Sequence, residues 1–400
     1  MSSNTLKRIS SFLSLQASWQ NLWNEARPKS RGTYGIDEVS LNDFSKNAVA
    51  NLHILSAQLR SGNYHFSELR PHFVEKPNGG VRVICIPTTQ DRIVQGALLN
   101  FLSEKYTARF SNKISFGFLK GRTVKEALEV GRKKRQKKPW VFKTDIKAFF
   151  DRIQRDQLKE KIRRVVREPT LHPLLFEIVD CEIQTPNKYT KKKILSLGIE
   201  SGRGVRQGMP LSPFFSNIVL EKFDKTVDST GYSALRYADD LIFFSADEPT
   251  CKEIEKFCRR NLKKEGLEIP LLSDPKTKSV IFNPTEPADF LGVAICKSGA
   301  SYQIKLLPDQ IAKIQKAILD LGSIPELLSR KITIGKLGTS LGARKAGYIN
   351  AYDMCSNIVE LENALDHIEQ KVLKRLYTEG LGIDLSKLSA TAYTFLGLRN

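Results

Sequence analysis

The chain has 400 residues, 41% of them hydrophobic, with a formal net charge of +20 and a pI near 9.6. It lacks an apolar stretch of membrane-spanning length and a signal-peptide core, which argues against a membrane or secreted protein and favours the cytoplasm. The six cysteines are dispersed without a Cys-x-x-Cys pair, which predicts reduced, buried thiols rather than a zinc finger or a disulfide framework. The positive charge attracts polyanions, nucleic acids among them, and the length predicts two or three domains.

The N-terminal part of the chain is predicted to be helical apart from one hairpin. A helical pattern covers residues 6–26, and helices near 40–60, 88–108 and 122–136 are expected to surround two strands. The turn residues Asn-Gly-Gly at 78–80 join those strands into a hairpin.

This hairpin would place Lys76 and Arg82 on paired strands facing an anionic ligand. The point charge of a lysine and the planar fork of an arginine suit a triphosphate. A basic hairpin that is merely solvated fits the same residues equally well.

Three carboxylates in the middle of the chain form the main candidate site. Residues 141–144 have the pattern of a buried strand, which places Asp145 at its end. Asp239 and Asp240 lie on a tight turn between two apolar, β-rich segments. Carboxylates at the ends of neighbouring strands can hold two Mg²⁺ ions about 4 Å apart, as in-line phosphoryl or nucleotidyl transfer requires. For residues 239 and 240 taken alone, a surface turn without function is the alternative.

The segment 203–217 is rich in glycine and proline, which predicts a loop until a helix begins at about Phe214. Backbone bared by glycine lets a base pair or sugar approach closely, and the amide of Gln207 can both donate and accept. Gln207 is therefore a candidate for a nucleotide pocket. An ordinary loop before a helix is the alternative.

Basic residues are concentrated in three regions. The densest runs lie at 132–138 and 191–193. From about residue 305 the pattern becomes helical, with apolar residues three and four apart and lysines and arginines between them. These regions suit a nucleic-acid backbone, with solvated charged faces as the alternative.

Several of these segments resemble the reverse transcriptases of group II introns and related bacterial enzymes. Residues 145–150 resemble the first palm motif of that family, residues 237–240 its Tyr-x-Asp-Asp motif and residues 204–217 its Gln-Gly-x-Pro-Leu-Ser-Pro segment. Further similar segments extend the resemblance over roughly residues 30 to 296, at 75–84, 86–95, 116–122, 275–278 and 290–293.

The resemblance implies an α+β, right-hand polymerase fold, with an antiparallel palm sheet, surrounding helices and a C-terminal helical thumb. The implied division is an N-terminal helical extension at 1–60, fingers at 61–140, a palm at 141–296 and a thumb at 297–400. Basic helices of the thumb would grip the backbone of a template–primer duplex.

The resemblance also implies two-metal nucleotidyl transfer. Asp145, Asp239 and Asp240 would hold two Mg²⁺ ions, with Mn²⁺ as an alternative, and Ile146 is a neighbouring candidate ligand.

Further residues would shape the nucleotide pocket around Lys76, Arg82 and Gln207, as the resemblance implies. Phe150 would lie beneath the sugar of the incoming nucleotide, where its ring excludes a 2′-OH. Tyr237 would support the primer end. Lys276, slightly preferred over Lys278, would act as general acid near the leaving pyrophosphate.

The implied activity is RNA-directed DNA synthesis from dNTPs. The expected partners are an RNA template, a structured non-coding RNA in particular, and a DNA primer or product, and a role in anti-phage defence is a further expectation. Two alternatives stay open: an RNA-binding, maturase-like scaffold, and a DNA polymerase that is template-independent or protein-primed.

Overall fold

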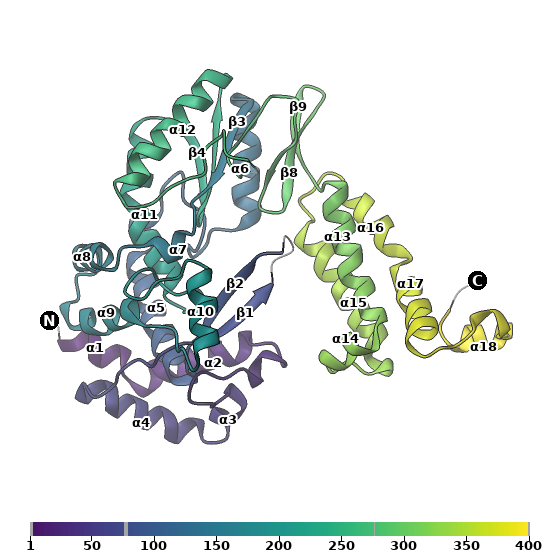
Figure 1. Cartoon of the computed structure of the whole chain (residues 1–400), viewed down its shortest axis with the longest axis horizontal. Coiled ribbons are helices and arrows are strands. Elements are labelled where there is room, and N and C mark those ends of the chain that lie inside the picture. The colour runs from purple at the N-terminus through teal and green to yellow at the C-terminus, as the bar shows by residue number, and fades with distance from the viewer. Residues whose placement is uncertain (1–2, 76–78, 276, 399–400) are drawn as a thin grey trace. The chain divides into compact units, whose positions relative to one another are not determined.

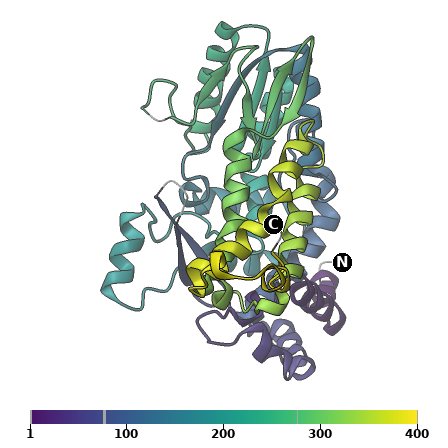
Figure 2. The ribbon, with the colours of Figure 1, turned by 90° about the vertical axis from the view of Figure 1, so that its right-hand side faces the viewer.

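The computed structural model describes residues 3–75, 79–275 and 277–398 (Figures 1 and 2). The chain divides into two compact units. The first comprises Met1–Thr123 and Phe142–Ile281, and the second comprises Val124–Val141 and Phe282–Asn400. Among the described helices, none is both long and apolar enough to cross a membrane.

Helices form the N-terminal part of the first unit. The pattern at 6–26 folds as two helices because the Ser11 hydroxyl caps the second one, accepting from the Ser14 amide at 3.2 Å. Ser18 ties this second helix to the long α5 (Thr89–Phe110) by donating to the Ile93 carbonyl at 2.7 Å. The other helices of this part are α1 (Ser3–Ile9), α2 (Phe12–Glu25), α3 (Leu41–Ser45) and α4 (Ala48–Ser61).

The predicted hairpin is formed by β1 (Arg70–Glu75) and β2 (Val81–Ile86), which pair antiparallel. Its second strand is tied to the glycine-rich segment, because the Cys85 amide donates to the Gln207 carbonyl at 2.7 Å. Alternate residues of β2 are buried, as the two-residue period of a strand requires.

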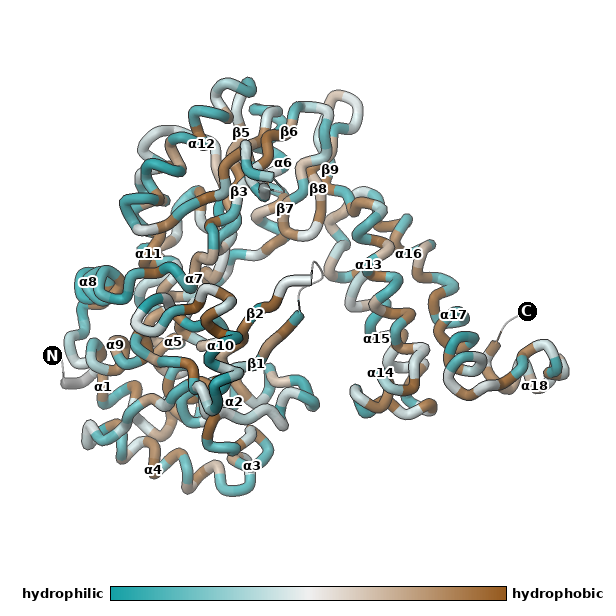
Figure 3. The backbone as a smooth tube through the Cα atoms, in the orientation of Figure 1, coloured by the Kyte–Doolittle hydropathy of each residue, from teal (hydrophilic) through white to brown (hydrophobic). Residues whose placement is uncertain are grey.

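A four-stranded sheet in the order β4-β5-β3-β6 carries the candidate site. The central β5 is buried at every residue after its first, which explains its continuous apolar run. Helix α12 (Glu248–Lys263) packs on β5. In Figure 3 the brown colour of hydrophobic residues marks the strands of this sheet. The strands are β3 (Trp140–Asp145), β4 (Ser233–Tyr237), β5 (Asp240–Ser245) and β6 (Val280–Phe282), and the remaining helices of the first unit are α7 (Phe149–Arg152), α8 (Arg155–Val165), α9 (His172–Asp180), α10 (Lys188–Ser196) and α11 (Ser212–Ser229).

The second unit contains helix α6 (Val124–Lys137) packed on a three-stranded antiparallel sheet. The expectation that residues 122–136 surround the hairpin strands is therefore wrong. Arg135 holds α6 in the second unit. Its side chain is fully buried and donates to the carbonyls of Ile295, Asn283 and Glu286. The strands of this sheet are β7 (Ala288–Phe290), β8 (Val293–Ser298) and β9 (Ser301–Lys305).

Helices follow β9, as the periodicity after residue 305 predicts. The sheet is tied to them by Asn357, whose side chain bonds both the amide and the carbonyl of Leu306, at 2.9 and 3.0 Å. The sheet and these helices belong to the same compact unit, whose second segment begins at Phe282. The single helix expected at 358–377 is interrupted at His367, which separates two shorter helices. The helices are α13 (Pro308–Leu319), α14 (Ile324–Ser329), α15 (Ile334–Ala351), α16 (Ile358–Asp366), α17 (Ile368–Arg375), a π-helical turn (Leu376–Gly380) and α18 (Ala390–Phe395).

All six cysteines are free and buried, as predicted. Burial raises the pKa of the Cys85 and Cys181 thiols to about 12, so both are protonated at neutral pH.

Candidate active site

The hairpin between β4 and β5 carries two of the three predicted carboxylates. Tyr237 pairs with Asp240 across the hairpin, so that Ala238 and Asp239 alone form the turn. Ala238 adopts the left-handed conformation, with φ at 57°, as tight hairpin turns require. Asp239 and Asp240 are partly buried, and the ring of Tyr237 beside them is partly exposed.

Asp145 lies at the end of β3, which neighbours β5 in the sheet. The Ile146 amide donates to the Asp239 carbonyl at 3.2 Å, which joins the two strand ends that carry the carboxylates. Ile146 is 1% exposed and its side chain is apolar, so its main-chain carbonyl is the one group it can offer a metal. The structure thus brings Asp145, Asp239 and Asp240 to one end of the sheet.

The carboxylates at this end of the sheet act on one another electrostatically. Burial, reinforced by the negative charge of Asp239, raises the pKa of Asp240 to about 6. Burial and the charge of Asp145 also raise the pKa of Asp239. A cation would relieve this repulsion, and such perturbed, adjacent acids are typical of functional sites.

Lys278 supplies one positive charge. Its ammonium forms an ion pair with Asp145, and this contact raises the pKa of the lysine. The Lys278 side chain is 70% exposed, so the ion pair is screened by water and is easily exchanged. Lys276, the slightly preferred candidate for the general acid, lies outside the described residues.

The oxygen donors of this site suit a hard divalent cation. Among the described residues, no three His, Cys, Asp or Glu side chains are already arranged as a metal cage. The site therefore fits a metal by its donor chemistry and its repelling charges. Lys278 contacts the Oδ2 of Asp145, and the second oxygen of that carboxylate is the one that a cation could bind without displacing the lysine.

Arg236, which the sequence analysis did not single out, holds the turn from behind. Its side chain is fully buried and forms a bidentate ion pair with Asp224 of α11, with Nε 2.7 Å from Oδ1. Its Nη1 donates to the Ala238 carbonyl at 3.0 Å, and its Nη2 donates to the Ser115 hydroxyl at 2.7 Å. The sequence signal for this role was an arginine beside the apolar residues of a predicted strand, where a charged side chain needs a buried partner.

Gly117 packs directly against the same turn. A Cβ at this position would lie 2.2 Å from the Ala238 nitrogen, so only glycine fits. The Gly117 carbonyl accepts from the Asn217 amide at 3.3 Å, and the Asn217 oxygen accepts from Arg236 at 3.2 Å. The turn, the loop at 115–117 and α11 are therefore one hydrogen-bonded assembly.

The β1–β2 hairpin places one predicted phosphate ligand within electrostatic reach of the carboxylates. Arg82 is exposed, and its positive charge partly offsets the rise in the pKa of Asp239. Lys76 lies outside the described residues.

The glycine-rich segment links the predicted pocket residues Phe150 and Gln207. The Val205 amide donates to the Phe150 carbonyl at 2.8 Å. Two residues later the Gln207 carbonyl accepts from β2, and Gly208 is so close that a Cβ would lie 2.4 Å from the Cys85 carbonyl oxygen. Both Phe150 and Gln207 are partly exposed, so their side chains are accessible to a ligand.

The chain matches the family model of the reverse transcriptase (RNA-dependent DNA polymerase) over residues 74–295, more than half of its length. It therefore belongs to the reverse transcriptase family, whose members use divalent metal ions. Its mixture of helices and antiparallel sheets is the right-hand polymerase fold of that family, as predicted.

Similar curated proteins come from bacteria and from introns. Protein YkfC of Escherichia coli is 28% identical over 204 residues, which cover 49% of this chain and 50% of YkfC. The retron Mx65 reverse transcriptase of Myxococcus xanthus is 26% identical over 221 residues, which cover 51% of this chain and 49% of that protein. The aligned parts span at most half the length of the curated relatives that the chain matches.

Two solved structures are also similar. Telomerase from Candida Tropicalis in complex with a TWJ fragment of telomeric RNA has a TM-score of 0.44 at 15% identity, covering 88% of this chain and 68% of that one. A partial Cas6-RT-Cas1–Cas2 complex has a TM-score of 0.38 at 21% identity, covering 65% of this chain and 41% of that one.

Proposed function

We propose that this protein is an RNA-directed DNA polymerase, which adds dNTPs to a primer opposite an RNA template. The observation that carries the proposal is the convergence of Asp145, Asp239 and Asp240 at one end of a sheet, within the segment that matches the family. Burial and the neighbouring negative charges raise the pKa of Asp239 and Asp240, and divalent cations bound beside them would relieve this repulsion.

The three carboxylates would hold two Mg²⁺ ions, or Mn²⁺ in their place, with the Ile146 carbonyl as a neighbouring ligand. When bound, the ions supply the positive charge that activates a primer hydroxyl and stabilises the α-phosphate as pyrophosphate leaves.

Other residues of the chain would bind and position the reactants. Arg82 and Lys76 would hold the triphosphate, and the Phe150 ring would exclude a 2′-OH. Gln207 would contact the incoming nucleotide and Tyr237 the primer end.

Lys278 is the described candidate for the general acid, and Lys276 is the other candidate. An ordinary lysine is already protonated at neutral pH, so the Lys278 ammonium could donate a proton to the leaving pyrophosphate once it separates from Asp145.

A structured non-coding RNA is the proposed template, and DNA is the proposed primer or product. Similarity to a retron reverse transcriptase supports this choice. The cytoplasm is the proposed location, and anti-phage defence is the proposed biological role.

The test of this function is the double variant Asp239→Asn/Asp240→Asn in primer extension with an RNA template, dNTPs and Mg²⁺. We expect synthesis to fall to background, while RNA affinity stays within about twofold because the backbone of the turn is retained. Undiminished synthesis by the variant would refute the assignment.

Sequencing of the nucleic acid that copurifies with each protein identifies the template. We expect complementary DNA with the wild type alone. RNA bound equally to both proteins, without DNA, would instead favour an RNA-binding scaffold.

A further inference from the structure

A basic groove lies on the first unit between α12 and the loop that follows it. Its volume is about 540 Å³. Lys147 and the apolar residues Ile269 and Leu271 form part of its lining. The rest of its wall is formed mainly by cations of α12, which are Lys256, Arg259, Arg260 and Lys263.

These four cations form a stripe along α12. Their spacing of three, four and seven residues puts them on one face, over about 10 Å of helix. All four are exposed. The opposite face of the helix carries the buried residues Ile254, Cys258 and Leu262. The stripe is therefore not needed to pack the helix, and its like charges repel one another at this spacing.

The acidic residues of the groove are engaged by other cations. Glu268 pairs with Arg152 at 2.7 Å, and Asp274 pairs with Lys147 at 3.3 Å. In the part of the chain that the structure describes, none of the four α12 cations forms an ion pair, although two of them act on these acids at longer range. The groove therefore retains a net positive charge.

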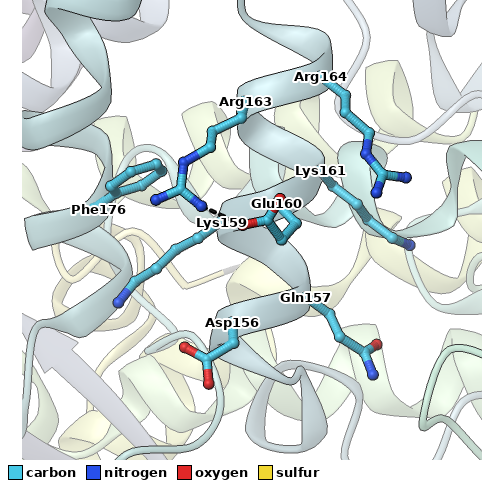
Figure 4. A pocket seen from close by; sticks show the side chains of 8 residues that line it. All are labelled: Asp156, Gln157, Lys159, Glu160, Lys161, Arg163, Arg164 and Phe176. Atoms are coloured by element: carbon cyan, nitrogen blue, oxygen red, sulfur yellow. Dashed lines mark hydrogen bonds and ion pairs between the residues drawn. The ribbon is translucent and has the colours of Figure 1, made fainter.

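A second basic pocket, of about 690 Å³ on α8, differs in this respect (Figure 4). Lys159 pairs with Asp180 at 2.6 Å, and Arg163 pairs with Glu160, as the dashed line in Figure 4 marks. Much of the charge in this pocket is neutralised within the protein. It therefore provides a matched control for the α12 groove.

The α12 groove is close to the candidate active site along the chain, because Lys147 of its lining follows the carboxylate-bearing end of β3. Lys147 lies two residues after Asp145, and its amide donates to the Glu268 carbonyl at 2.8 Å. The described residues that line the groove include no aromatic ring on which a base could stack. The groove therefore suits phosphate groups rather than bases.

We propose that the α12 groove binds the phosphate backbone of RNA that extends beyond the polymerising site. The choice of RNA as the polyanion rests on the proposed function. Contacts with phosphate alone are independent of sequence, so the groove would retain any RNA of sufficient length.

The test compares the triple variant Arg259→Gln/Arg260→Gln/Lys263→Gln with the matched triple variant Lys159→Gln/Arg163→Gln/Arg164→Gln. Both remove three positive charges from the surface of a helix; of the six side chains, five are exposed and Lys159 is partly buried. The affinity for a long single-stranded RNA is measured by fluorescence anisotropy over a range of salt concentrations. Thermal unfolding of each variant verifies that it is folded.

We expect the α12 variant to lose about tenfold in affinity, and the slope of log K against log salt to fall by about 2, because three phosphate contacts are lost. The α8 variant should remain within about twofold of the wild type. Wild-type affinity and slope in the α12 variant, or equal losses in both variants, would overturn the proposal. A comparable loss is expected with single-stranded DNA of the same sequence, because contacts with phosphate alone do not distinguish the two polymers, and unchanged DNA binding would overturn phosphate as the group that the groove binds.

Primer extension by the wild type on a short template–primer separates this proposal from the proposed function. Failure of that reaction counts against polymerase activity alone, since occupancy of the groove is measured by binding.

Discussion

Arg236 links the inside of the sheet to the turn that carries two carboxylates. Its ion pair with Asp224 is fully buried, and its Nη1 bonds the Ala238 carbonyl. A buried ion pair adds little net stability, but removal of one partner leaves an unpaired charge in the interior. Arg236 is thus a positioning residue, whose effects on folding and on the turn can be separated.

Replacement of Arg236 by Met should lower the free energy of unfolding by about 3–5 kcal/mol, because Asp224 is left buried without a partner. Urea unfolding measures this loss. The double variant Arg236→Met/Asp224→Leu should regain much of the stability but little primer extension, since the Ala238 carbonyl still lacks its donor. Full synthesis by the double variant would show that Arg236 does not position the turn.

We expect metal affinity to depend on pH because the pKa of Asp240 is raised. Its pKa of about 6 means that the carboxyl is neutral below this pH and ionised above it. Because a cation binds the ionised form, affinity should decrease as the pH falls through 6, by up to about tenfold per unit. Calorimetric titration with Mn²⁺ between about pH 5 and 7 measures this change. A constant affinity over that range would contradict the prediction.

At the scale of elements, helix α6 shows that the residues of a basic run need not all be exposed on the surface. Arg135 lies within the run 132–138, yet its guanidinium is buried against carbonyl groups of the second unit and stacks on Tyr302, 4.8 Å from the ring centroid. Lys137, two residues later, is exposed. The same run thus contains one residue of the core and one of the surface.

This difference predicts opposite outcomes for neighbouring substitutions. Arg135→Gln should lower the free energy of unfolding by about 3 kcal/mol, because the buried Ile295 carbonyl and the partly buried carbonyls of Asn283 and Glu286 lose their donor. Lys137→Gln should change it by no more than about 0.5 kcal/mol. Chemical denaturation of both variants decides the point, and equal stability would place Arg135 outside the core.

Local turn chemistry made two elements predictable from the sequence. The hairpin of β1 and β2 follows from Asn-Gly-Gly, and the β4–β5 hairpin follows from a tight turn between apolar runs. The position of α6 was not predictable, because it depends on carbonyls about 150 residues away along the chain. Likewise, the motif points to Asp239, but the support given by Arg236 and Gly117 arises only from packing between distant segments.

At the scale of the whole molecule, the chain forms two compact units, each built from segments that are not consecutive in the sequence. A segment from the middle of the chain, Val124–Val141, belongs to the same unit as the C-terminal helices. Consecutive sequence blocks could not predict this arrangement, because the second unit is closed by contacts between distant segments. The net charge of +20 is likewise shared between structural arginines and exposed cations, so it overstates the charge available to a ligand.

The hydrogen bond between the Ile146 amide and the Asp239 carbonyl has a consequence for dynamics. Because this amide is buried, its proton should exchange with deuterated solvent only when the end of β3 separates from the turn. Its exchange rate would then measure how often the carboxylate-bearing strand ends come apart, and comparison with the slowest core amides would show whether that opening is local or accompanies global unfolding.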